Sequence, residues 1–280
     1  MHPILCRWAD GTTLATYSVL TALGYLTGIA WLRTQVRNMQ GTPALFYSLV
    51  GTLLFAALAG GKIGFFIVEW REFSANPGPM LLEWNTGWVF WSGFLLACLA
   101  GFFYQLWYNK THRPRAYLPV ADYFAAALAL GHVIGRVGCW SEGCCHGSPT
   151  GLPWGSAFMD PASSVPRHLL GVLLHPTQLY EAFGEAVAAA VLIGWVLPSI
   201  RAGKFRYGTA FIGYFFYYSI MRFLIEFLRG DDRGVFLSSA LSPSQWICLA
   251  AGLVAAWALK TRGVRETDFA NRSIYSDGRP

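Results

Sequence analysis

The stretch from Pro43 to Val68, PALFYSLVGTLLFAALAGGKIGFFIV, is the part of the sequence that most directly predicts the fold. Lys62 is its single charged residue. The run from Trp88 to Trp107 is equally apolar and carries no charge. Because a helix of about 20 apolar residues crosses the hydrocarbon core of a bilayer, both stretches are predicted to be transmembrane helices.

The composition excludes an ordinary soluble protein. Of the 280 residues, 54% are hydrophobic and 13% are charged, whereas soluble domains carry roughly 25% charged residues. A soluble fold of this length would need more polar surface than this chain supplies. The net charge of +6 comes from basic residues spread over short loops, so no nucleic-acid partner is predicted.

Seven apolar stretches are predicted to span the membrane. They are residues 14–32, 43–69, 87–108, 119–138, 176–198, 208–229 and 242–260. The loops after the first, third, fifth and seventh stretches are basic. Their basic residues are Arg33, Arg37, Lys110, Arg113, Arg115, Arg201, Lys204, Arg206, Lys260, Arg262 and Arg265. The positive-inside rule places these loops in the cytoplasm. The prediction is therefore an all-α integral membrane protein with its N-terminus outside and its C-terminus cytoplasmic.

The chain is predicted to form one membrane domain over residues 1–264, followed by a polar cytoplasmic tail at 265–280. Residues 139–175 are rich in Gly, Pro, Ser and Cys. This segment is too polar to lie in lipid and too long for a simple turn, so it is expected to form a small periplasmic head. An almost neutral segment precedes the first apolar stretch, so we expect that stretch to stay in the membrane as a helix.

Charged residues inside predicted spans are candidates for function, because burying them in lipid is costly. Arg222 and Glu226 are four residues apart and can pair on one helical face, with Tyr218 one turn earlier. Arg136 lies at the end of the fourth span. Two arginines facing each other across a bundle would form an anion site, because guanidinium groups match phosphate oxygens. In a membrane, the obvious phosphate is a phospholipid headgroup.

Structural explanations compete with this interpretation. Arg222 and Glu226 could pair only to hold helices together, and Arg136 could extend to the outer interface. Asp122 and Lys62 lie nearer the ends of predicted spans, where structural roles are more common.

Several of these residues belong to motifs that resemble those of the bacterial prolipoprotein diacylglyceryl transferases. Residues 175–181, HPTQLYE, resemble the HPxQLYE element of that family. Residues 135–138, GRVG, and the glycine-bearing segment that ends at Gly147 are similar to a second element. The run from Tyr218 to Glu226, with Arg229 after it, is similar to the YxxxRxxxE element.

Two further positions extend the resemblance toward the N-terminus. Tyr17 lies in the first predicted span, and residues 60–64, GGKIG, carry Lys62 where arginine is usual in the family. The likeness runs from about residue 14 to residue 260 in the family's order.

The resemblance implies an activity at the outer face of the bacterial inner membrane, in a multi-pass membrane protein. The family transfers the diacylglyceryl group of phosphatidylglycerol to the lipobox cysteine of a preprolipoprotein, and glycerol phosphate is released. The implied partners are phosphatidylglycerol, the lipobox-containing signal peptide and membrane lipids. No metal and no organic cofactor is expected.

The resemblance also implies roles for individual residues. Arg136 and Arg222 would bind and neutralise the phosphate, and Glu226 would orient Arg222. Tyr17 and His175 would complete the catalytic set. The remaining residues implied to bind or support substrate are Tyr218, Gly147, Gln178, Tyr180, Glu181 and Cys139.

Two departures from the family pattern bear on the substrate more than on the fold. The family's HGGL turn is here Trp91-Ser92-Gly93-Phe94, so its histidine is replaced by Trp91. An asparagine of the family's second element is here Cys139. His132 and His146 are candidate general bases in place of the missing histidine.

The cysteine cluster at Cys139, Cys144 and Cys145, with His146 beside it, permits three readings. Cys139 could form a disulfide with one of the other two, as an oxidising compartment allows. The four residues could bind a metal ion. The thiols could also be free, and reactive if Arg136 lowers a nearby pKa.

Two other classes of function remain open from the sequence. The chain could be a related lipid or acyl transferase that uses the cysteine segment for a different acceptor. It could also be a phospholipid-binding membrane protein without activity. A transport protein that uses the same arginines is the related possibility. Transporters often contain repeated, broken helices, and we find no internal repeat in this sequence.

Overall fold

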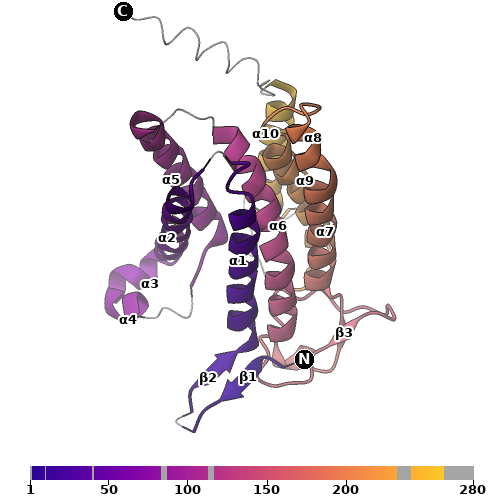
Figure 1. Ribbon diagram of the computed structural model, residues 1–280. Helices are drawn as coiled ribbons and strands as arrows, with labels where there is room; N and C mark the ends of the chain where they lie inside the picture. Colours follow the sequence, from indigo (N-terminus) through magenta and orange to yellow (C-terminus); the bar gives the residue numbers. More distant parts are fainter. Residues whose placement is uncertain are drawn as a thin grey trace, which may run out of the picture. The chain divides into compact units, whose positions relative to one another are not determined.

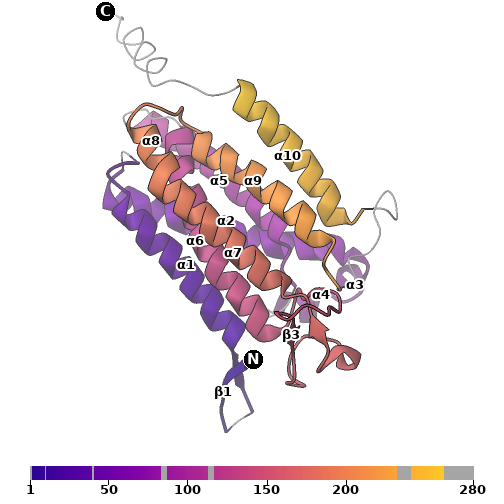
Figure 2. The same cartoon turned by 90° about the vertical axis from the view of Figure 1, so that its right-hand side faces the viewer.

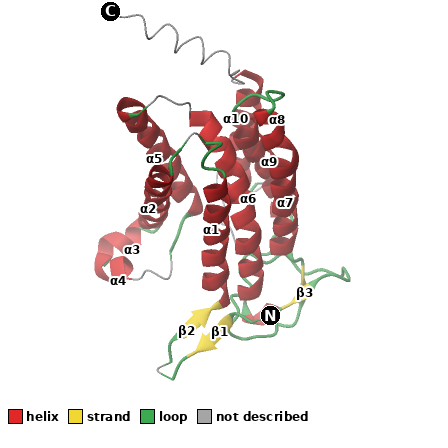
Figure 3. Ribbon diagram, viewed as in Figure 1, coloured by secondary structure: helices red, strands yellow, loops and turns green. Residues whose placement is uncertain are grey.

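The computed structural model describes residues 2–9, 11–39, 41–82, 87–112, 117–231 and 241–261. The predicted tail at 265–280 lies outside these residues, as do Arg113, Arg115, Arg262 and Arg265. The described chain is mostly helical (Figure 3). It divides into two compact units, one of residues 1–32 and 118–280 and the other of residues 33–117.

The first unit contains most of the chain (Figure 1). Its elements are β1 (Ile4–Arg7), β2 (Thr13–Ala15), α1 (Thr16–Thr34), α6 (Tyr117–Glu142), β3 (Ser156–Ala157), η1 (Arg167–Leu169), β4 (Leu173–Leu174), α7 (Thr177–Val191), η2 (Leu192–Val196), α8 (Leu197–Arg201), α9 (Thr209–Glu226) and α10 (Pro243–Thr261). The strands form two antiparallel pairs, β1 with β2 and β3 with β4. Helix α10 packs along α9 (Figure 2).

The regular elements in the described part of the second unit are all helices. Its elements are α2 (Pro43–Val68), α3 (Trp70–Ala75), α4 (Pro77–Leu82) and α5 (Phe90–Thr111). Helices α2 and α5 make the main contact within it.

Each of the seven stretches predicted to span the membrane is helical in the structure. The fifth is a continuous helical column made of α7, η2 and α8, with a π-helical turn at Leu192–Val196. Pro198 lies two residues after this turn, and proline cannot donate a backbone hydrogen bond within a helix. Among the described residues, three helices are long and apolar enough to cross a membrane by length and composition: Pro43–Val68, Tyr117–Glu142 and Thr177–Arg201.

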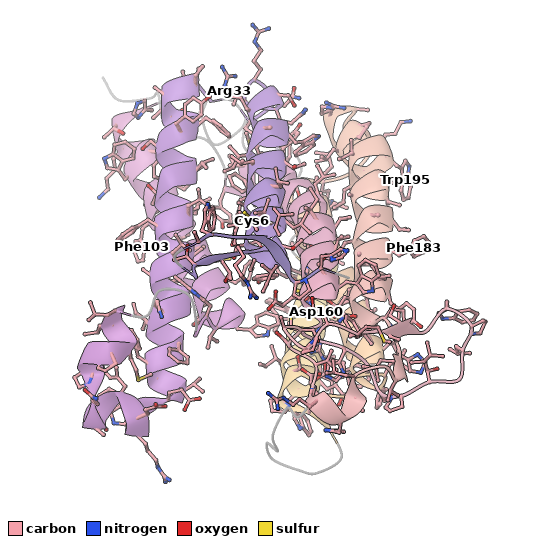
Figure 4. All side chains as sticks on the ribbon, turned by 90° about the horizontal axis from the view of Figure 1, so that it is seen from below. Cys6, Arg33, Phe103, Asp160, Phe183 and Trp195 are labelled. Atoms are coloured by element: carbon pink, nitrogen blue, oxygen red, sulfur yellow. The ribbon has the colours of Figure 1, made fainter. Side chains whose placement is uncertain are left out.

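Large apolar side chains cover the outer surface of the helices. Phe183 of α7 and Trp195 of η2 point away from their neighbours and are 72% and 60% exposed (Figure 4). Leu253 of α10 is 71% exposed. Soluble proteins rarely expose contiguous apolar surface on this scale. These faces are suited to contact with lipid, which confirms the predicted membrane character.

Glycines bring α1 and α6 into close contact. A Cβ atom on Gly24 would lie 2.7 Å from the backbone oxygen of Gly131, and one on Gly28 would lie 3.0 Å from that of Ala127. Small residues spaced four apart allow helix backbones to approach closely in membranes.

Glycines also allow α2 and α5 to pack closely against each other in the second unit. A Cβ atom on Gly60 would lie 2.7 Å from the backbone oxygen of Ser92, and one on Gly93 would lie 2.5 Å from that of Ala57. The sequence GGKIG therefore packs against the segment in which Trp91 replaces the family's histidine.

The segment after α6 begins later than predicted. Helix α6 continues through Glu142 instead of ending near residue 138. Trp140 explains the extra turn, because it packs on the buried cluster of Phe158, Val165 and Leu174. The helix then ends at Gly143, whose φ of 84° is left-handed.

Asp122 has a structural contact at the opposite end of α6. Its carboxylate accepts hydrogen bonds from the backbone N–H groups of Gly208 and Phe211, at 2.7 and 2.9 Å. It thereby caps the start of α9 from a neighbouring helix. This agrees with the interpretation that Asp122 is a structural residue.

The close packing of α1 on α6 predicts that alanine substitutions at two glycines have different effects on the stability of the protein. We expect Gly24→Ala to destabilise the protein by about 1–3 kcal/mol, because the added methyl group overpacks the contact. Gly213→Ala is the control, since a Cβ atom there meets nothing within 4 Å. It should be neutral or stabilising by up to about 1 kcal/mol through helix propensity. Thermal unfolding of both variants in detergent measures the difference, and equal effects would contradict the packing argument.

Candidate functional site

A buried carboxylate, Glu181 of α7, pairs with two arginines from different helices. One of its oxygens pairs with Nε of Arg136 in α6. The other lies 3.4 Å from Nε of Arg222 in α9. The Glu181 side chain is 1% exposed, and those of Arg136 and Arg222 are 14% and 7% exposed. The two arginines that were predicted to face each other are thus held on one carboxylate.

The ion pairs continue from Arg222 along α9 and beyond its end. Arg222 Nη1 lies 2.5 Å from Glu226, as the four-residue spacing predicted. Glu226 lies 3.9 Å from Nε of Arg229, and Arg229 donates two hydrogen bonds to Asp231, at 2.8 and 2.6 Å. Every buried arginine in this row therefore has a carboxylate partner, which is the arrangement that makes burial of such charges tolerable.

The network also runs from Arg136 toward the middle of the bundle. Arg136 Nε donates to Nε2 of His132 at 3.2 Å, and His132 Nδ1 lies 3.1 Å from Glu185. Since Nε2 accepts a hydrogen bond, the ring proton belongs on Nδ1, facing Glu185. Glu185 also accepts a hydrogen bond from Tyr214 at 3.0 Å. Both nitrogens of His132, considered above as a general base, are engaged in this network.

The terminal nitrogens of Arg136 are the donors that remain. Among the described residues, Glu181 and His132 both engage its Nε. A guanidinium carries five N–H donors, so the two terminal nitrogens can serve a further acceptor. Tyr218 is buried nearby in α9, with its ring 5.5 Å from that of His132.

The turn that follows α6 is anchored on the first residues of α7. Gln178 Nε2 donates to the backbone oxygen of Cys144 at 2.8 Å. Thr177 Oγ1 donates to the backbone oxygen of Cys145 at 2.7 Å. The motif HPTQLYE therefore has two roles here, since it holds the cysteine turn and supplies the shared carboxylate Glu181.

Gly147 lies where three backbone segments meet. Its N–H donates to the backbone oxygen of His175 at 2.9 Å, and it forms a β-bridge with Arg229. A Cβ atom on Gly147 would lie 2.6 Å from the His175 oxygen and 2.7 Å from that of Leu228. No side chain fits at this crossing, which is the physical reason for glycine.

His175, Tyr180 and Trp154 form a separate polar contact. The Tyr180 hydroxyl accepts a hydrogen bond from Trp154 Nε1 at 2.9 Å and lies 3.3 Å from His175 Nδ1. Trp154 is 59% exposed. Within the described chain, these contacts connect His175 to the surface segment and not to the buried ion pairs.

Tyr17 lies on α1 beside the last turns of α6. A Cβ atom on Gly138 would lie 3.3 Å from Tyr17 Cδ2, and Tyr17 is 39% exposed. Its phenol also interacts electrostatically with the three thiols of the cysteine turn.

Cys139, Cys144 and Cys145 lie together, with their Sγ atoms all within 4.8 Å of one another. All six cysteines of the chain are free thiols, so the disulfide considered above is not formed in this structure. Hydrogen bonds from the other two thiols lower the pKa of Cys145, and Arg229 and Arg136 lower it further. His146 is buried, and its Nδ1 lies 3.0 Å from the backbone oxygen of Gly147. The side chains that converge as possible metal ligands are the three thiols, without His146.

Sequence reasoning missed the parts of the network that are not in the quoted motifs. Glu185 and its contact with His132 were not predicted, although two glutamates four residues apart in an apolar helix are an unusual signal. Trp91 lies in the second unit, where its ring is 6.3 Å from that of Phe94.

Comparison with known proteins identifies a family. The family model of prolipoprotein diacylglyceryl transferase matches residues 3–261. A phosphatidylglycerol–prolipoprotein diacylglyceryl transferase of Solidesulfovibrio magneticus is 30% identical over 271 residues, which are 94% of this chain and 92% of that protein. Proteins of the same name from Clostridium tetani and Cupriavidus metallidurans are 29% and 28% identical, over 89% and 91% of this chain and 93% and 88% of theirs.

The shared carboxylate should dominate the stability of this site. We expect Glu181→Gln to destabilise the protein by about 3–5 kcal/mol, because it leaves two buried arginines short of a charge partner. Glu72→Gln is the control, since Glu72 is an exposed residue of α3 and its substitution should cost at most about 1 kcal/mol. Unfolding in detergent, monitored by circular dichroism, compares the two. A cost for Glu181→Gln as small as that of the control would contradict this account.

Proposed function

This chain belongs to the prolipoprotein diacylglyceryl transferase family, and we propose that it transfers the diacylglyceryl group of phosphatidylglycerol to the lipobox cysteine of preprolipoproteins. Glycerol phosphate is the second product. The observation that carries this proposal is the pair Arg136 and Arg222, both held on Glu181. Among the described residues, the hydrogen bond of Arg136 is made by Nε, so its terminal nitrogens can meet a phosphate.

The reaction replaces one bond at a glyceryl carbon. The sulfur of the acceptor cysteine attacks the carbon that bears the phosphate ester, a C–S bond forms, and the C–O bond breaks. The thiol proton is lost, and the electron pair of the broken bond stays on the phosphate. The catalytic problem is therefore to hold a phosphate and to stabilise the charge that grows on it.

Arg136 and Arg222 are suited to that task. Both side chains are largely removed from solvent, where a fixed positive charge acts more strongly than in water. Glu181 and Glu226 hold the guanidinium groups in place before the substrate arrives, so little reorganisation is needed at the moment of reaction. A single donor of this kind is worth about 2.7–4 kcal/mol in mutational studies of other enzymes.

The other motif residues support this site. Tyr17 of α1 and Tyr218 of α9 are proposed to line it, and Cys139 lies one turn after Arg136 in α6. Gln178 and Gly147 hold the turn that borders it. His175 and Tyr180 join the same turn to the exposed Trp154, where an incoming peptide would first make contact.

The chain is proposed to cross the bacterial inner membrane seven times, with its N-terminus outside. Basic residues occupy the last turns of four helices, namely Arg33, Lys110, Arg201 and Lys260. Within the first unit, the β1–β2 hairpin and β3 lie at one end, and the C-terminal ends of α1, α8 and α10 lie at the other (Figures 1 and 2). This arrangement supports placing the basic ends in the cytoplasm and the head in the periplasm.

The transfer is tested with the purified chain in detergent, phosphatidylglycerol and a lipobox peptide. We expect peptide-dependent release of glycerol phosphate, and a loss of about 100-fold or more in kcat/KM for Arg136→Ala and for Arg222→Ala. Arg136→Lys should also be impaired, because lysine keeps the charge but not the planar fork.

Two controls make this assay specific. Arg167→Ala removes an exposed arginine from η1 and should retain activity within about threefold of wild type, because an exposed charge contributes little. A peptide with serine in place of the lipobox cysteine should give no release. Absence of release from folded wild-type protein, with several phospholipids and peptides, would overturn the proposed function.

Reporter fusions test the membrane arrangement. Green fluorescent protein fused after Pro280 should fluoresce, and alkaline phosphatase at the same position should be inactive, because the C-terminus is placed in the cytoplasm. Alkaline phosphatase fused within the exposed segment around Asp160 should be active. The reverse pattern would show that the assigned orientation is wrong.

A further inference from the structure

The proposed transfer leaves the acceptor thiol without an assigned base. A cysteine thiol with a pKa of about 8.5 is only about 3% ionised at pH 7, and the thiolate is the nucleophile. In this chain Trp91 stands where the family's motif has a histidine. Another feature of the molecule must therefore favour the thiolate.

The three thiols of the cysteine turn have the spacing of a metal centre. Zn–S bonds of about 2.3 Å place the sulfurs of one tetrahedral ion roughly 3.8 Å apart. The Sγ atoms of Cys139, Cys144 and Cys145 all lie within 4.8 Å of one another. Each side chain is partly exposed, so an ion can reach the group. Soft thiolate ligands select zinc among the common divalent ions.

The backbone is shaped so that neighbouring cysteines can act together. Consecutive side chains usually diverge, and this makes Cys144 and Cys145 an awkward pair of ligands. Cys145 has a φ of 62°, and no other described residue except glycine has a positive φ. Such a conformation persists only where its surroundings enforce it. Here Thr177 and Gln178 fix the carbonyl groups of both cysteines.

Two arginines lie close to the three thiols. Arg229 hydrogen-bonds to Cys145, and Arg136 interacts electrostatically with Cys139 and Cys145. Three thiolates around one divalent zinc ion leave one net negative charge. The two arginines lie where they offset that charge.

The geometry points to a zinc site formed by Cys139, Cys144 and Cys145, with its fourth position open to the acceptor thiol of the lipoprotein. Three protein ligands and one open position are the usual pattern of catalytic zinc. A thiol that coordinates zinc is deprotonated. This inference rests on the proposed function, which it extends from phosphate binding to activation of the thiol.

The step balances without any oxidant or reductant. The acceptor thiol releases its proton to solvent when its sulfur binds zinc. That sulfur then forms the C–S bond to the glyceryl carbon, and the C–O bond to phosphate breaks. Glycerol phosphate leaves with the bonding electrons, and zinc keeps its charge throughout.

The metal is measured first, without reference to activity. We expect full-length protein purified in detergent from zinc-supplemented cells to contain about one zinc per chain by mass spectrometry of the metal. Cys139→Ser, Cys144→Ser and Cys145→Ser should each lose most of it. Cys98→Ser is the matched control, because Cys98 lies in α5 of the second unit and should leave the zinc content unchanged.

Cobalt reports whether the acceptor binds the metal. Protein reconstituted with Co²⁺ should show thiolate-to-cobalt absorption, and a lipobox peptide should change that spectrum. The same peptide with serine in place of cysteine should not change it. Wild-type protein that binds neither metal, or whose thiols are found as a disulfide, would overturn the proposal. A spectrum that does not respond to the cysteine peptide would overturn the open fourth position.

Activity separates this inference from the proposed function. Zinc removal with a chelator should lower the transfer rate at pH 7 by about 30-fold or more, as expected if the acceptor returns to an ordinary thiol equilibrium. Added zinc should restore the rate. Full transfer activity in metal-free protein would overturn the zinc role and leave the transferase function intact. Zinc bound in the expected ratio, with no transfer to any peptide, would instead refute the proposed function and leave the metal site.

Discussion

The site depends on one buried carboxylate. Glu181 is 1% exposed and pairs with Arg136 and Arg222, which come from two other helices. Either arginine alone would be costly at its depth, and the shared carboxylate offsets both charges at once. The relative positions of α6, α7 and α9 are thus tied to a single side chain. Within the described part of the chain this contact engages Nε of Arg136 and not its terminal nitrogens, so the interaction that stabilises the bundle is compatible with the proposed phosphate site.

The segment around Glu181 links the two halves of the proposed chemistry. Gln178 and Thr177 hold the cysteine turn through its carbonyl groups, and Glu181 holds the arginines one turn later. The site proposed for the leaving phosphate and the site proposed for the acceptor thiol would both be positioned by the first two turns of α7. Their separation is set by helix geometry, which is stiffer than a loop.

Particular residues show how far sequence reasoning reached. The pairing of Arg222 with Glu226 was predictable because a four-residue spacing places two side chains on one helical face. The seven helical stretches were predictable because apolar runs of this length have one stable conformation in lipid. The family was identified from short motifs, and the match over residues 3–261 confirms it. The pairing of Glu181 with two arginines was not predictable, since it joins three helices that are distant in sequence.

The sequence by itself determined that this is a helical membrane protein, which residues carry its motifs, and which family it belongs to. These properties depend on composition and local spacing, because lipid leaves the backbone few alternatives. Only the tertiary structure decided which partner each charge has and that Cys139, Cys144 and Cys145 converge. The left-handed backbone at Cys145 and the hydrogen bonds from α7 produce that convergence. Such contacts arise between segments, and no periodicity within one segment encodes them.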